Sequence, residues 1–272
     1  MAHIVKYEFK RSRIYDIKNE MIRCELFYKT RITKIIQFEG WAIGFLLLSK
    51  AVKEDNSLFE EYTKADNRKK IIESLDTIGA FDNSKQYQAE LFEKAYLDLY
   101  QAFEFFILDC YLSIFCIYPK LLRLFNEKIS GEYSLDEKII INNNEDIIND
   151  LIDETLDKLS RSKSIIEQIE TLNKLPLEIN LTKNDSEQIK IFSKNRNQLI
   201  HNDGRISKAF IKKLEQMEIE NNFEIGNFLT RDYFTKVPLN NYNDLLNNTV
   251  KYISNRIASA NLKLQAFNAD FK

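Results

Sequence analysis

Residues 102–118, with the sequence AFEFFILDCYLSIFCIY, are the most hydrophobic segment of the chain and decide its fold class. Only three polar side chains interrupt this segment before Pro119. A membrane span is one interpretation, but the carboxylates of Glu104 and Asp109 would each cost about 2.5–3.5 kcal/mol near a bilayer centre, and the segment is slightly short. We therefore expect residues 90–125 to form a helix that is buried on nearly all sides of a helical bundle.

The composition of the 272 residues also favours an all-α protein. Only six glycines and three prolines are present, which indicates long helices and few sharp turns. The formal net charge of -2 gives no bulk attraction to nucleic acid, so any RNA or DNA binding has to use a local basic patch. The three cysteines include no CxxC pair, and we expect them to be buried, reduced thiols in a cytoplasmic protein.

Hydrophobic periodicity predicts most of the other helices. Apolar residues recur at helical spacing over residues 144–175, which predicts one long amphipathic helix that stops before Pro176. Residues 7–49 are predicted to form one or two helices, and their final apolar run, 41–48, is predicted to be core because it is too short to cross a bilayer. Shorter helices are expected at residues 67–78, 207–217 and 240–267.

The polar, mixed residues 51–85 indicate a boundary between two parts of the chain. We expect this boundary near residue 88. Residues 1–88 are then an N-terminal helical region of unknown role, and residues 89–272 are the main helical bundle. No internal repeat stands out.

Residues 194–204, with the sequence KNRNQLIHNDG, contain side chains that can bind anions or transfer protons, and they lie on one predicted helix. Asn184-Asp185-Ser186 predicts the N-terminal cap of their helix, and Gly204 predicts its end, which places His201 in the last turn. Arg196 and His201 are rotated by about 140° around this helix, whereas Asn197 and His201 share a face. One stripe of the helix, apolar apart from its arginine, consists of Ile189, Phe192, Arg196, Leu199 and Ile200.

A cation within an apolar stripe needs a partner. Glu104 and Asp109 are buried or half-buried acids if residues 90–125 form a core helix, so one of them is predicted to orient Arg196. The alternative is that both acids reach solvent at the edge of the bundle.

Other kinds of active site lack support in the sequence. Metal ligation needs clusters of His, Cys and carboxylate, but the chain has two histidines and one of them is His3. Glycine loops for nucleotides and the GxSxG nucleophile elbow are also missing. We therefore expect neither a metal nor a cofactor.

Residues 196–201 fit the Arg-polar-x-x-x-His pattern (R-x4-6-H), and RNQLIHNDG resembles the motif of HEPN domains, a large family of helical-bundle proteins in prokaryotic toxin, abortive-infection and CRISPR systems. Residues 103–122 look like the first bundle helix of that family. Residues 223–229, followed by a final helix, look like its ending. The resemblance covers roughly residues 90–265, and it implies a HEPN-like antiparallel bundle.

The resemblance implies a metal-independent endoribonuclease, in which the ribose 2′-OH attacks the adjacent phosphate and leaves a 2′,3′-cyclic phosphate. His201 would be the acid/base, Arg196 would clamp the phosphate, and Asn197 would orient the histidine or bind a phosphate oxygen. Asn202 and Lys194 are expected to contact the RNA. Two motifs in this family usually meet in a homodimer, so we expect a composite site, a toxin or anti-phage defence role, an antitoxin partner and no membrane.

Two other interpretations remain. The chain can be a non-catalytic interaction or RNA-binding subunit of a toxin–antitoxin or defence system. Alternatively, Arg196 only extends along an apolar stripe, and His201 only occupies a helix end. The basic character of this region is modest, because nearby acids offset the basic residues Lys190, Lys194, Arg205, Lys208, Lys212 and Lys213.

Overall fold

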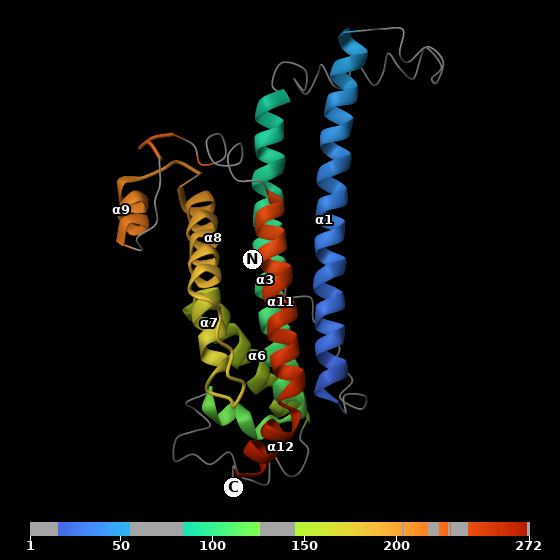
Figure 1. The fold of residues 1–272 in the computed structure, drawn as a ribbon, viewed down its shortest axis with the longest axis vertical. Coiled ribbons are helices and arrows are strands. Elements are labelled where there is room, and N and C mark those ends of the chain that lie inside the picture. The colour runs from blue at the N-terminus through green and yellow to red at the C-terminus, as the bar shows by residue number, and fades with distance from the viewer. Residues whose placement is uncertain are drawn as a thin grey trace, which may run out of the picture. The chain divides into compact units, whose positions relative to one another are not determined.

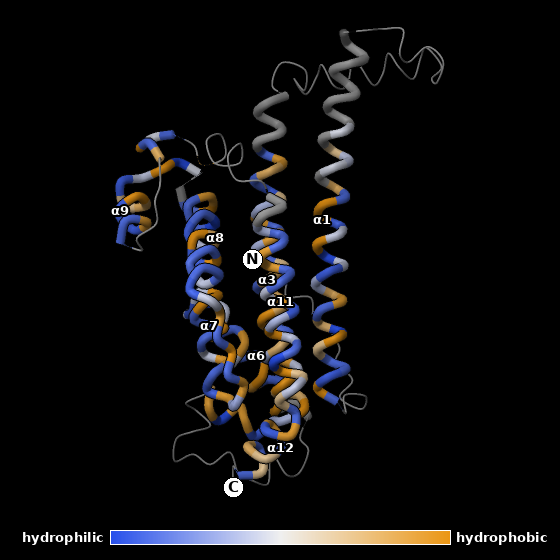
Figure 2. The backbone as a smooth tube through the Cα atoms, in the orientation of Figure 1, coloured by the Kyte–Doolittle hydropathy of each residue, from blue (hydrophilic) through white to orange (hydrophobic). Residues whose placement is uncertain are grey.

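The protein was analysed as a computed structural model, which describes residues 16–54, 84–125, 145–202, 204–216, 223–227, 229 and 239–270. These residues are mostly helical and include no β-strand, which confirms the predicted all-α class (Figure 1). The predicted helix at 67–78 and His3 lie outside the described residues. Hydrophilic and hydrophobic residues alternate along α8 and α11, as expected for amphipathic helices (Figure 2).

The helix expected over residues 90–125 ends earlier than predicted, at Ile117. Pro119 terminates this apolar helix and begins a 3-10 helix, since proline cannot continue an α-helix but suits a first position. In chain order the elements are α1 (Ile17–Glu54), α3 (Ser84–Ile117), η3 (Pro119–Leu124), α6 (Glu145–Ser162), α7 (Ile165–Leu172), α8 (Lys183–Asn202), α9 (Lys208–Gln216), α11 (Leu239–Ser259) and α12 (Asn261–Asp270).

The chain forms two compact units, and α1, α3, α8 and α11 each contribute residues to both. The first unit contains Met1–Tyr28, Phe103–Ile189 and Leu246–Lys272, and the second contains Lys29–Ala102 and Lys190–Leu245. The division of the chain near residue 88 stays a prediction.

The second half of α3 is the core of the first unit, as its hydrophobicity predicts. Tyr111 is fully buried, and its hydroxyl donates a hydrogen bond to the backbone oxygen of Gln168, 2.6 Å away. The side chains of α3 in this unit with no exposed surface are Phe103, Phe106, Ile107, Cys110, Tyr111, Ser113, Ile114 and Phe115. Residues 90–117 are long and apolar enough to span a membrane, and just over half of their most apolar stretch is buried within the protein.

The three cysteines are free, as predicted, and Cys24 and Cys110 are buried, but the expectation that all three are buried is wrong for Cys116, which is half-buried. The Cys24 sulfur lies 3.5 Å from the hydroxyl oxygen of Ser113. Burial raises the pKa of the Cys24 thiol to about 12 and that of Cys110 well above its ordinary value. Both are therefore protonated thiols at neutral pH.

The single helix predicted over residues 144–175 is wrong, because a capping box divides it into α6 and α7. Ser164 has extended backbone angles, its side chain accepts a hydrogen bond from the Glu167 backbone N–H, and the Glu167 carboxylate accepts one from the Ser164 backbone N–H. This reciprocal pair satisfies two backbone donors that a helix N-terminus otherwise leaves free, so a new helix begins at Ile165.

A second correction concerns α1. Trp41 was predicted to be core, but 74% of its surface is exposed, and Phe38 is 56% exposed. Among the described side chains of α1, the buried apolar residues lie at helical spacing in its first half, namely Ile17, Met21, Cys24, Tyr28 and Ile32.

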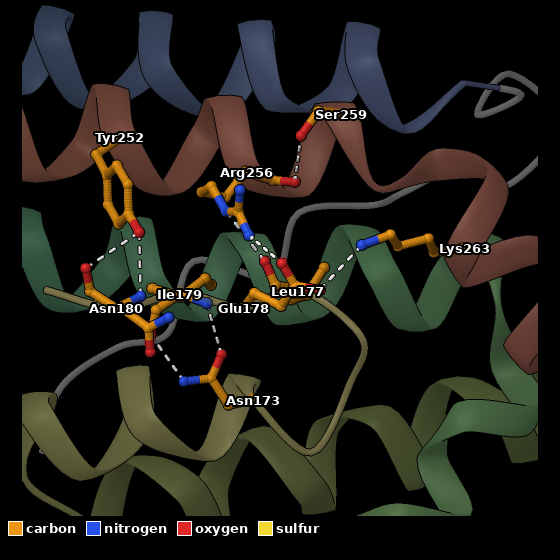
Figure 3. A network of polar contacts seen from close by, with 9 residues as sticks. All are labelled: Asn173, Leu177, Glu178, Ile179, Asn180, Tyr252, Arg256, Ser259 and Lys263. Atoms are coloured by element: carbon orange, nitrogen blue, oxygen red, sulfur yellow. Dashed lines mark hydrogen bonds and ion pairs between the residues drawn. The ribbon is translucent and has the colours of Figure 1, made fainter.

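The loop between α7 and α8 is held from both sides by side chains (Figure 3). The Asn173 side chain exchanges two hydrogen bonds with the backbone of Ile179, at 2.8 and 2.7 Å. The Tyr252 hydroxyl accepts from the backbone N–H of Asn180 and donates to its carbonyl oxygen. These bonds replace the backbone pairing that a loop lacks.

Glu178 is the most strained residue of this loop, with a φ of 53°. Its carboxylate lies 3.0 Å from the guanidinium of Arg256 and 3.0 Å from the ammonium of Lys263 (Figure 3). Arg256 also donates to the backbone oxygen of Leu177, 3.2 Å away. The two cations therefore hold the strained backbone to α11 and α12.

Substituting Glu178 by glutamine is expected to lower the free energy of unfolding at neutral pH but not in acid. Hydrogen bonds from Lys263 and Arg256 lower the pKa of Glu178 from its ordinary value of 4.5. Its contribution is therefore present above pH 4.5 and is lost as the pH falls through the lowered pKa. Urea titrations at several pH values should show the difference from wild type shrinking in that range.

The matched control for this substitution is Glu170→Gln, because Glu170 is an exposed glutamate on the neighbouring helix α7. This variant should change stability little at any pH, as is usual for surface positions without special contacts. A Glu178→Gln difference that persists at the lowest pH would contradict the ion-pair explanation.

Candidate functional site

The helix that carries the predicted motif, α8, begins one residue before the predicted cap. Thr182, and not the predicted Asn184-Asp185-Ser186, caps it: its hydroxyl oxygen accepts from the backbone N–H of Asp185 at 3.1 Å and donates to the carboxylate at 2.8 Å. Threonine suits this position because its oxygen satisfies a free N–H group of the first turn.

The end of α8 confirms the prediction from Gly204. The helix stops at Asn202, so His201 lies in its last turn, and Gly204 has a φ of +72°. A Cβ atom at Gly204 would lie 3.3 Å from the Leu199 side chain, so both the backbone angle and the space favour glycine.

Residues beyond Gly204 fix this end of the helix by backbone pairing. The Gly204 carbonyl accepts from Leu229 N at 2.7 Å, and Ile206 N donates to Asn227 O at 2.8 Å. The Gln198 side chain donates to the backbone oxygen of Arg205. The last turn of α8, which presents the exposed His201, is therefore anchored to a second segment.

Arg196 is half-buried and lies against an aromatic ring. Its guanidinium carbon is 5.2 Å from the centre of the Tyr100 ring, and its Nη1 donates to Asn197 Oδ1 at 3.0 Å. In the part of the chain that the structure describes, it forms no ion pair with a carboxylate. A guanidinium with its face on a ring keeps its in-plane N–H groups available to an anion.

A cluster of four aromatic residues from α3, α8 and α11 holds the Tyr100 ring. Phe192 is fully buried at its centre, with ring centres 5.4 Å from Tyr100, 4.6 Å from Tyr96 and 5.0 Å from Tyr242. The Tyr96 hydroxyl also donates to the backbone oxygen of Phe192, 3.1 Å away. This packing fixes the surface on which Arg196 rests.

The interpretation of Ile200 as part of a buried stripe is wrong, because Ile200 is 46% exposed. Ile189, Phe192 and Leu199 are buried as predicted, so the buried face is centred away from Ile200. Arg196 therefore lies at the edge of the buried face and not in its middle. From this edge its guanidinium reaches Asn197, the neighbouring exposed residue.

Sequence reasoning missed two residues of this region, Tyr100 and Asn195. Asn195 has no exposed surface, and neither its side-chain oxygen nor its nitrogen has a hydrogen-bond partner within the described parts of the chain. A buried amide without hydrogen-bond partners is unfavourable by about 1–3 kcal/mol. The sequence contains a signal for this residue: Asn195 lies three residues after Phe192 and four before Leu199, which places a polar side chain on the apolar face of the helix.

Asn197 and His201 are both exposed and Lys194 is half-buried, so all three face solvent at least in part. The side chain of Asn202 lies outside the described residues. Glu104 and Asp109 are half-buried and have interactions of their own, and their predicted role with Arg196 stays a prediction. No group of three or more His, Cys, Asp or Glu side chains suited to a metal ion occurs within the described ranges.

Comparisons of the chain with models of known protein families, with curated protein sequences and with solved structures find no match.

Proposed function

We propose that this protein is a metal-independent endoribonuclease of the HEPN type, acting as a toxin or an anti-phage defence effector. The observation that carries the proposal is the half-buried Arg196, whose guanidinium carbon lies over the Tyr100 ring, which is bonded to Asn197 and which is unpaired with any carboxylate among the described residues. An exposed imidazole, His201, lies in the last turn of the same helix. A cation and a proton carrier are what 2′-OH attack on a phosphodiester requires.

Arg196 binds the phosphate in this proposal. As the 2′ oxygen attacks, negative charge develops on the two non-bridging oxygens, and a planar guanidinium donates to both. The contact with Tyr100 and the hydrogen bond to Asn197 restrict the position of the group before substrate arrives, so little reorganisation is needed in the transition state.

His201 transfers the protons. One imidazole accepts the proton of the 2′-OH, and an imidazolium donates a proton to the departing 5′ oxygen, which leaves a 2′,3′-cyclic phosphate and a free 5′-OH. In-line displacement places these two oxygens on opposite sides of the phosphorus. One histidine does not serve both at once, so the proposed site combines His201 from two copies of the chain.

A second candidate is a non-catalytic RNA-binding or interaction subunit with the same fold. One observation favours it: within the described residues His201 forms no hydrogen bond or ion pair that would fix its ring. An unoriented imidazole is a poor general base until a partner or substrate positions it.

Mixing wild type with His201→Ala tests both the activity and the composite site. If one site needs His201 from each copy, dimers formed from equal amounts should retain about one quarter of the wild-type RNA cleavage, whereas independent sites would retain about one half. The matched control mixes wild type with Lys183→Ala, which alters a lysine paired with Glu187 on the same helix and should leave activity unchanged.

A rate of RNA cleavage that rises linearly with the fraction of wild-type protein in the mixture would contradict the composite site. Wild type that cleaves neither tRNA nor total RNA would contradict the activity and favour the binding subunit. The toxin role has its own readout: bacterial growth should stop on expression of wild type but continue with Arg196→Ala or His201→Ala.

A further inference from the structure

The polar face of α8 carries a row of basic and polar side chains that the proposed chemistry uses only at one end. Successive members are separated by four, three and four residues, so they lie within about 60° of one another around the helix and extend over about 16 Å. The row, called the α8 stripe below, consists of Lys190, Lys194, Asn197 and His201.

Among the described residues, no carboxylate compensates the charges of the α8 stripe. Lys190 is exposed and Lys194 is half-buried, and neither pairs with a carboxylate in the described part of the chain. The acidic residues of α8 are confined to its first turns, where Asp185 bonds to Thr182 and Glu187 pairs with Lys183 at 3.7 Å. After Glu187 the helix contains no acid.

The helix dipole does not account for this distribution. It favours acids in the first turn and cations in the last turn, and its effect falls off within one turn of each end. Lys190 lies in the middle of α8, more than two turns from Asn202. The Lys190 ammonium therefore has no compensating partner among the described residues and is available to an external anion.

We propose that Lys190 and Lys194 bind successive phosphates of single-stranded RNA on one side of the phosphate held by Arg196 and His201. This inference rests on the proposed function for the position of the scissile phosphate. Lysine is a suitable point charge for backbone phosphates, and a single row along one helix follows one strand. Duplex RNA instead needs contacts across its wide minor groove to both strands.

The test measures how binding depends on salt. A uniformly 2′-O-methyl single-stranded oligonucleotide is the probe, because it keeps the phosphates but lacks the attacking hydroxyl, so binding is separated from cleavage. For single strands the slope of log K against log salt changes by about 0.7 for each phosphate that the protein no longer neutralises. Fluorescence anisotropy should therefore show a slope reduced by about 0.7 in Lys190→Gln or Lys194→Gln and by about 1.4 in the double variant.

Lys183→Gln is the matched control, since its ammonium already pairs with Glu187 on the same helix, and its slope should equal that of wild type. Helical content measured by circular dichroism should be the same in all variants, because the substituted side chains are at least partly exposed. A duplex probe should bind more weakly than the single strand.

The inference is overturned if the double variant keeps the wild-type slope, if Lys183→Gln changes it equally, if the duplex binds more tightly, or if wild type does not bind the probe. These outcomes are separate from the proposed activity. If wild type cleaves RNA but the double variant keeps the wild-type salt slope, only the binding of phosphates by Lys190 and Lys194 is contradicted. If the double variant has a reduced slope but wild type does not cleave RNA, only the nuclease activity is contradicted.

Discussion

Replacing His201 by alanine is expected to lower the rate of RNA cleavage by on the order of 10²–10⁴-fold, the usual contribution of a general acid or base. The full effect is expected because each composite site loses both of its imidazoles. His201 is exposed at the end of α8, so the unfolding transition should stay close to that of wild type. Cleavage rates at saturating RNA, with Lys183→Ala as control, measure the effect.

Arg196→Lys separates charge from geometry at the same site. Lysine keeps the positive charge but loses the planar donor pair and the stack on Tyr100, so we expect a large loss in cleavage rate with little change in salt-dependent RNA binding. Wild-type rates in either His201→Ala or Arg196→Lys would contradict the roles proposed for these residues.

Substituting Phe192 by alanine is expected to lower the free energy of unfolding by about 3–5 kcal/mol, the usual effect of removing a buried phenylalanine ring. Phe192 has no exposed surface and contacts Tyr96, Tyr100 and Tyr242, so its removal leaves a cavity among three helices. Urea or guanidinium titration of the whole chain measures the change. The orientation of Arg196 should also be less fixed, since Tyr100 would no longer be held.

Phe38→Ala is the matched control for this prediction. The same side chain is removed, but Phe38 is 56% exposed on α1, so the change should stay within about 0.5 kcal/mol. Equal destabilisation by the two substitutions would contradict the explanation that Phe192 stabilises the protein through its burial in the aromatic cluster.

Local signals made much of the fold predictable. The apolar run at 102–118 predicts a core helix and Gly204 predicts the end of α8, and the structure confirms both, whereas the helix expected to continue to residue 125 ends before Pro119. Each signal acts through the backbone of its own segment: proline lacks an N–H group, and glycine accepts a positive φ. These effects do not depend on the rest of the chain.

Two errors concern the residues at which helices begin, and in the first of them periodicity was given more weight than a local signal. Ser164 and Glu167 have the spacing of a capping box, yet the apolar residues continue at helical spacing across them, and one helix was predicted where there are two. Thr182 caps α8 in place of the later polar residues, because its hydroxyl reaches the Asp185 N–H.

The rest of the site depends on contacts between residues far apart in the chain. Tyr100 and Arg196 are separated by 96 positions, and nothing in the periodicity of either helix pairs them. Exposure of Trp41 and Ile200 has the same origin, since an apolar residue is buried only where another element covers it. The residue types of the motif could be read from the sequence, but the contact of Arg196 with the Tyr100 ring could not.

The chemistry of the cut ends tests the central claim most directly. RNA incubated with purified wild type in EDTA should yield fragments with 2′,3′-cyclic phosphate and 5′-hydroxyl ends, and Arg196→Ala and His201→Ala should yield none. Fragments with 3′-hydroxyl ends, or cleavage that EDTA abolishes, would show that water or a metal-bound nucleophile cuts the RNA and that Arg196 and His201 do not act as proposed.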